Sequence, residues 1–193
     1  MDTLEIAPED DDLLQGRELI PGIDYTPGID LTINSQKLLT EKEGYEAFLY
    51  TLLRYWEMSS CTDLTDILSG GEYVALGRPM DTAFWYYWLD ALTNVRTLGP
   101  PQLANVPRQM AISDKRIAIE GSQTLTEQEG YEALLYTLLQ YWKKTGKDDL
   151  TAILSAGAYV EPDMPADPVI WYAWLEAIAT VRRQGPPPLK VLH

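Results

Sequence analysis

The chain has 193 residues, 46% of them hydrophobic, and its 29 acidic against 15 basic residues give a formal net charge of −14. This length suits one large domain or two small ones, and no apolar run reaches the roughly 18–20 residues of a membrane span. The single cysteine, Cys61, excludes an internal disulfide, and the acidic N-terminus lacks the pattern of a signal peptide, so we expect a cytoplasmic protein.

Residues 1–30 are expected to form an extended acidic arm. The run EDDD at 9–12 and the echo PGIDYTPGID at 21–30 combine proline, glycine and clustered like charge, all of which oppose a helix. A surface with this excess of acidic residues repels nucleic-acid phosphates and favours fast association with a basic protein. The candidate partner-binding residues of the arm are Glu9, Asp10, Asp11 and Asp12. A merely solvated acidic surface is the alternative.

The rest of the sequence repeats itself. Residues 39–101 match residues 125–187 at 36 of 63 positions without a gap. A duplication of this size predicts two homologous small helical units, at 31–101 and 117–189, joined by a linker at 102–116. A unit so small buries a limited core, so we expect the two units to pack on each other as a pseudo-dimer.

Each unit is predicted to be mainly α, with about three helices. A short edge strand is expected before them, at 31–33 and 117–119. The first helix begins at a capping box, Thr40-x-x-Glu43 or Thr126-x-x-Glu129. Apolar residues then recur at helical spacing, which indicates an amphipathic helix. They are Tyr45, Phe48, Leu49, Leu52, Leu53 and Trp56 in the first unit and Tyr131, Leu134, Leu135, Leu138, Leu139 and Trp142 in the second.

A short helix and a second long helix complete each unit. Aspartates are expected to cap both helices: Asp63 or Asp149 the short one, and Asp81 or Asp167 the long one. Glycines at 70–71 and 157 end the short helix, and a loop or short strand follows. Gly-Pro-Pro at 99–101 and 185–187 ends the long one.

The sequence offers few groups for catalysis. Nucleophilic mechanisms need a base beside the nucleophile, yet the only histidine is His193, and the second unit has Lys147 in place of Cys61. Zinc sites need clustered cysteine and histidine. Asp148-Asp149 and the 9–12 cluster lack the alternating pattern of a calcium loop. We therefore predict no enzyme activity, no catalytic residue, no cofactor and no metal site.

Four tyrosines lie off the apolar stripes of the long helices and are further candidate partner-binding residues. They are Tyr50 and Tyr136 on the first helices and Tyr86 and Tyr172 on the last ones. Tyrosine is common at protein interfaces because it combines a large ring with a polar tip. Burial between the two units, or inheritance from a recent duplication, would also explain them.

The second unit combines LTEQEGYEA at 125–133, DDLT at 148–151 and DPVIWYAWLEA at 167–177. This pattern resembles small bacterial immunity proteins encoded beside polymorphic or contact-dependent toxins. The resemblance implies a protein that binds a cognate toxin in the cytoplasm and blocks its active site. The chain departs from the family in being doubled and in its acidic arm, and no toxin-contacting residue is carried over.

Three functions follow from these features. The first is an immunity protein that occludes a basic toxin or nuclease, without contacting nucleic acid or membrane. The second is an acidic nucleic-acid mimic that inhibits a DNA-binding enzyme. The third is a structural or adaptor module with two equivalent binding surfaces, whose bivalency would raise avidity.

Overall fold

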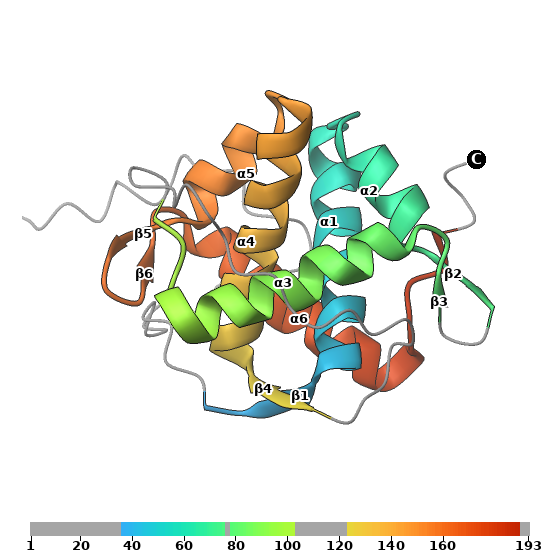
Figure 1. Cartoon of the computed structure of the whole chain (residues 1–193), viewed down its shortest axis with the longest axis horizontal. Helices are drawn as coiled ribbons and strands as arrows, with labels where there is room; N and C mark the ends of the chain where they lie inside the picture. Colours follow the sequence, from blue (N-terminus) through green and yellow to red (C-terminus); the bar gives the residue numbers. More distant parts are fainter. Residues whose placement is uncertain (1–35, 76–77, 103–122, 190–193) are drawn as a thin grey trace, which may run out of the picture.

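The computed structural model describes residues 36–75, 78–102 and 123–189. This part of the chain is mainly helical, as the sequence predicts, with six helices and short strands (Figure 1). No described helix is long and apolar enough to cross a membrane. The arm at 1–30, the edge strands expected at 31–33 and 117–119, and residues 103–116 of the linker lie outside the described residues.

The two units contain the same elements in the same order. The first has β1 (Leu38–Thr40), α1 (Glu41–Ser59), α2 (Leu64–Gly71), β2 (Tyr73–Ala75), β3 (Arg78–Pro79) and α3 (Thr82–Leu98). The second has β4 (Thr124–Thr126), α4 (Glu127–Thr145), α5 (Leu150–Gly157), β5 (Tyr159–Glu161), β6 (Met164–Pro165) and α6 (Pro168–Gln184). Strands β2 and β3 form one hairpin, and β5 and β6 form the other.

Most helix caps form as predicted. In the first capping box, the Glu43 backbone N–H donates to the Thr40 hydroxyl at 3.1 Å, and the Thr40 N–H donates to the Glu43 carboxylate at 2.7 Å. Thr126 and Glu129 repeat this arrangement at the start of α4. Asp81 and Asp167 accept from the backbone at the starts of α3 and α6. These side chains satisfy backbone donors that a helix N-terminus leaves free.

The prediction that Asp63 and Asp149 cap the short helices through their side chains is wrong. Both occupy the N-cap position, but neither makes a capping hydrogen bond. Each faces the other unit instead. Lys147 Nζ lies 3.6 Å from Asp63 Oδ1, and the Cys61 thiol donates to Asp149 Oδ2 at 3.8 Å. A contact between units therefore replaces the expected local bond.

Strands β1 and β4 join the starts of the two units. They pair antiparallel with Leu39 opposite Leu125, both of them buried. Two further backbone hydrogen bonds continue the pairing, from Glu41 N–H to the Gln123 carbonyl at 3.0 Å and from Glu127 N–H to the Lys37 carbonyl at 2.9 Å. Each first helix therefore begins on backbone supplied by the other unit.

The last helix of each unit crosses onto the first helix of the other. Helix α3 packs on α4 and α6 packs on α1, and Figure 1 shows the two crossing helices on opposite faces. One continuous cluster of buried side chains contains residues of both units. Within this cluster the Trp88 and Trp174 ring centroids lie 6.5 Å apart. Because α1 and α4 have neighbours on several sides, they are buried well beyond their apolar stripes.

These contacts predict how the second unit behaves alone. A fragment of residues 110–193 lacks α1 and α3, so α6 and α4 lose the helices on which they pack. We expect little helix in the dilute fragment, and a helical homodimer at higher concentration, in which each α6 packs on the partner's α4. Circular dichroism and light scattering over a concentration series would test this. A folded monomer as stable as the whole chain would contradict it.

Candidate functional site

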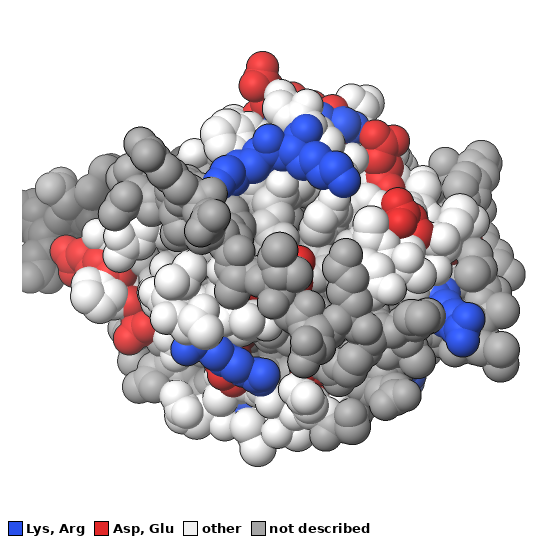
Figure 2. Space-filling model, in the orientation of Figure 1, with Lys and Arg blue, Asp and Glu red and all other residues white. Residues whose placement is uncertain are grey.

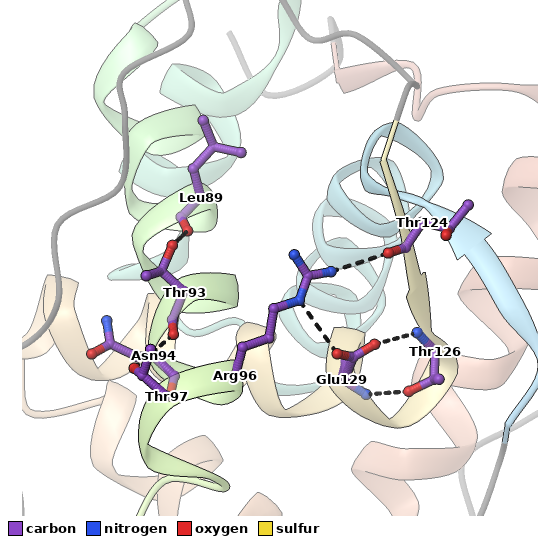
Figure 3. Close-up of polar contacts among 8 residues, drawn as sticks. All are labelled: Leu89, Thr93, Asn94, Arg96, Thr97, Thr124, Thr126 and Glu129. Atoms are coloured by element: carbon purple, nitrogen blue, oxygen red, sulfur yellow. Dashed lines mark hydrogen bonds and ion pairs between the residues drawn. The ribbon is translucent and has the colours of Figure 1, made fainter.

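An arginine in the last turn of α3 fastens this helix to the second unit. Arg96 Nη2 donates to the Thr124 carbonyl at 3.0 Å, and Nε donates to Glu129 Oε1 at 3.4 Å (Figure 3). The other oxygen of Glu129 accepts from Thr126 in the capping box, at 2.7 Å. One carboxylate thus starts α4 and holds the end of α3.

Arg182 does the same for α6 and the first unit. It donates to the Leu38 carbonyl at 2.8 Å and to Glu43 Oε1 at 3.4 Å. Burial opposes ionisation of Glu43, but its bonds from Thr40 and Arg182 outweigh burial and hold its pKa below the usual value. The C-terminal end of α6 is therefore fixed beside the start of α1.

A groove lies between the remaining lengths of these two helices, and we call it the α1–α6 groove. Its volume is about 210 Å³, and it is open to solvent on one side. Its walls come from both units: Tyr50, Leu53, Arg54 and Glu57 on α1, and Ala173, Glu176, Ala177 and Thr180 on α6. The groove therefore exists only because α6 crosses onto the other unit.

The α1–α6 groove combines apolar, aromatic and charged side chains. Tyr50 is half-buried at its wall, and burial raises the pKa of this phenol above its usual value, which already leaves it neutral at pH 7. Arg54 Nη1 lies 3.7 Å from Glu57 Oε2 on the next turn of α1. The carboxylate of Glu176 is exposed on α6. Two carboxylates and one guanidinium give the groove a net negative charge.

The equivalent place between α3 and α4 is filled differently. Tyr87 stands where the α1–α6 groove has Ala173, and Asn94 stands where it has Thr180. Asn94 is fully buried, whereas Thr180 is half-buried. Tyr136, the counterpart of Tyr50, is only 1% exposed. Asn94 and Tyr136 are therefore more deeply buried than their counterparts in the α1–α6 groove.

The structure separates the candidate tyrosines. Tyr50 lines the α1–α6 groove, whereas the ring of Tyr136 packs inside the protein, as the internal-packing alternative expects. Tyr86 and Tyr172 are half-buried against the core and do not line the groove. The acidic candidates Glu9, Asp10, Asp11 and Asp12 lie outside the described residues.

Sequence reasoning missed the residues that complete the α1–α6 groove on α6. Ala173 and Glu176 lie on the last helix of the second unit. From the repeat alone, that helix is expected to pack on the first helix of its own unit. One signal was present, because the large change from Tyr87 to Ala173 interrupts a well-matched stretch of the two units. It becomes informative only once α6 is known to cross onto α1.

Two buried carboxyls lie elsewhere, beneath the hairpins. Glu132 is 5% exposed and accepts from the Tyr159 hydroxyl at 3.0 Å and from the Gln128 amide at 3.2 Å. Gln128 also donates to Asp163, in the turn between β5 and β6, at 2.7 Å. Burial raises the pKa of Glu132, and the bonds from Tyr159 and Gln128 oppose this shift. These contacts tie the hairpin to α4.

In the first unit, Glu46 takes the place of Glu132. It is 3% exposed, and Lys42 Nζ lies 3.3 Å from its carboxylate. Burial raises the pKa of Glu46, which Lys42 opposes. No group of three or more His, Cys, Asp or Glu side chains within the described ranges is arranged to hold a metal ion.

Comparison with known proteins gives no match to a family model, to a curated protein or to a solved structure.

The buried Glu132 carboxyl predicts a pH dependence of stability. The pKa of this carboxyl is higher in the folded than in the unfolded state. Its contribution to the free energy of unfolding is therefore complete below its unfolded-state pKa and is lost as the pH rises through its folded-state pKa. We expect Glu132→Gln, which keeps an acceptor for Tyr159, to raise the free energy of unfolding by about 1 kcal/mol at pH 8 and to change it little at pH 5. Urea unfolding at both values would measure this.

Glu161→Gln is the matched control, because Glu161 is an exposed carboxylate on the same hairpin. It should leave the difference between pH 5 and pH 8 unchanged. A Glu132→Gln variant that is destabilised equally at both values would contradict the assignment.

Arg182 predicts a second effect on stability. Replacing it by methionine keeps the apolar stem and removes the bonds to Leu38 and Glu43. We expect the free energy of unfolding to fall by about 1 kcal/mol, the upper range for an exposed ion pair. Arg183→Met is the control, since the hydrogen bond that Arg183 makes among the described residues stays in its own helix, to the Thr180 hydroxyl at 3.4 Å. Equal losses in both variants would show that Arg182 does not fasten the units.

Proposed function

We propose that the protein is an immunity protein, which binds a basic toxin in the cytoplasm and blocks its active site. Three features support this proposal. The sequence pattern resembles that of such proteins, the chain carries a net charge of −14, and the α1–α6 groove offers an aromatic ring beside carboxylates. Charge complementarity with a basic partner raises the rate of encounter and rejects wrong partners.

The α1–α6 groove carries the proposal furthest. Interface hot spots are enriched in tyrosine and arginine that fill pockets on the partner, and this groove presents Tyr50 and Arg54 around a space open to such a side chain. Because its two walls belong to different units, the duplication itself builds the site. In this proposal the chain acts as a covalent pseudo-dimer with one binding face.

The alternatives find less support. The described residues hold 18 Asp and Glu against 10 Lys and Arg, but Figure 2 shows basic side chains gathered near the upper edge of the α3 face. One acidic group of the described residues is also already paired, because Lys147 lies 2.6 Å from Asp66. A nucleic-acid mimic needs rows of free acidic groups instead. A bivalent adaptor needs two equivalent surfaces, and Tyr87 makes the two junctions differ.

A test of the proposal is capture of the partner by the intact chain. We expect one basic toxin or nuclease per chain, bound more weakly in 300 mM than in 50 mM salt because electrostatic attraction is screened. Co-expression should also rescue cells from the toxin encoded beside this gene. Failure of both capture and rescue would refute the proposal. Capture of a DNA-binding enzyme that DNA displaces from the chain would favour the nucleic-acid mimic. Capture of two partner molecules per chain would favour the adaptor.

A further inference from the structure

We propose that the α1–α6 groove receives an arginine side chain of the partner, and that the α3–α4 junction does not. This inference rests on the proposed function, since it names the group that a basic partner inserts. It follows from the size of the groove, from the chemistry of its walls, and from the residues that differ between the units.

The size of the α1–α6 groove suits one side chain. Its volume of about 210 Å³ is below the range of about 300–1,000 Å³ that is typical of pockets for drug-sized ligands. A whole metabolite would therefore fit poorly, whereas a single long side chain would occupy most of the space.

The walls of the α1–α6 groove match the two parts of an arginine. Leu53, Ala173 and Ala177 offer apolar surface for the methylene stem. The Tyr50 ring can lie against the planar guanidinium, which stacks on aromatic faces and is attracted by them. Arginine fits better than lysine here, because lysine is a compact and strongly hydrated charge.

The charges in the α1–α6 groove favour a cation. Arg54 is the basic residue of the lining, and it lies 3.7 Å from Glu57. Glu176 stands on the opposite wall, and no ion pair joins it to another residue in the described part of the chain. An entering guanidinium would give Glu176 a partner and leave the groove neutral.

The α3–α4 junction differs at the positions that matter. Tyr87 stands in place of Ala173, and Lys143 stands in place of Glu57. The first change brings a ring to the position that is small in the α1–α6 groove. The second replaces a carboxylate by a cation. With Gln140 in place of Arg54 and Asp90 in place of Glu176, the equivalent side chains carry no net charge, so they attract a guanidinium less than the α1–α6 groove does. The chain therefore offers one site for the side chain, which agrees with one partner per chain.

The experiment uses the intact chain labelled with ¹⁵N and the probe N-acetyl-arginine-N-methylamide. The matched control probe is the citrulline analogue, which keeps the shape and removes the charge. We expect saturable shifts of the amide signals of 50–57 and 173–180 with the arginine probe, at concentrations up to roughly 20 mM because small fragments bind weakly. The citrulline probe should bind at least about fivefold more weakly, the size of one screened charge interaction.

Two variants locate the site. Ala173→Tyr copies the residue of the α3–α4 junction into the α1–α6 groove and should abolish the shifts. The double variant Glu57→Gln with Glu176→Gln changes two exposed carboxylates and should weaken the arginine probe about five- to tenfold, with no effect on citrulline. Should Ala173→Tyr fail to fold, the double variant decides the question alone.

Three results would overturn the inference: no localised shifts, equal shifts with both probes, or binding unchanged in the double variant. The outcome is separable from that of the proposed function. If the chain captures a toxin and rescues cells but does not bind the arginine probe, only this inference is refuted. A chain that binds the probe in the α1–α6 groove but neither captures nor rescues keeps the site and loses the immunity function.

Discussion

The structure depends on reciprocal attachment between the two units. Each first helix begins on backbone of the other unit through the β1–β4 pairing, and each last helix ends against the other unit's capping box through Arg96 or Arg182. The first backbone N–H groups of a helix have no acceptor inside the helix. The contacts from the other unit supply acceptors for some of these groups. The shared core, the crossing of α3 and α6, and the α1–α6 groove all depend on this reciprocal attachment.

Local signals in the sequence predicted the elements well. Capping boxes, the aspartates before α3 and α6, and the terminating glycines depend on neighbours within a few residues, and these predictions are confirmed. The sequence predicts edge strands at 31–33 and 117–119 but no strand at β1 and β4, because three residues give no periodicity. Asp63 failed as a side-chain cap because Lys147, 84 positions away, offers it an ion pair.

The site could be predicted only in part. Tyr50 was found because it lies off the apolar stripe of its own helix. The same reasoning selected Tyr136, which is buried, because periodicity on one helix does not say what a second helix covers. The α6 wall of the groove depends on a crossing between distant segments. Such contacts leave no local pattern, since they are decided by the packing of large rings such as Trp88 and Trp174.

The difference between Tyr87 and Ala173 has a consequence for how such a protein evolves. In a homodimer every substitution is made twice, so a change that opens one junction opens the other as well. In a chain that contains both units in tandem, a substitution in one unit leaves the other unit unchanged. One junction can carry a tyrosine, Tyr87, while the other carries an alanine, Ala173, at the wall of a groove. Two matching units within one chain can thus differ at one junction while the other stays unchanged.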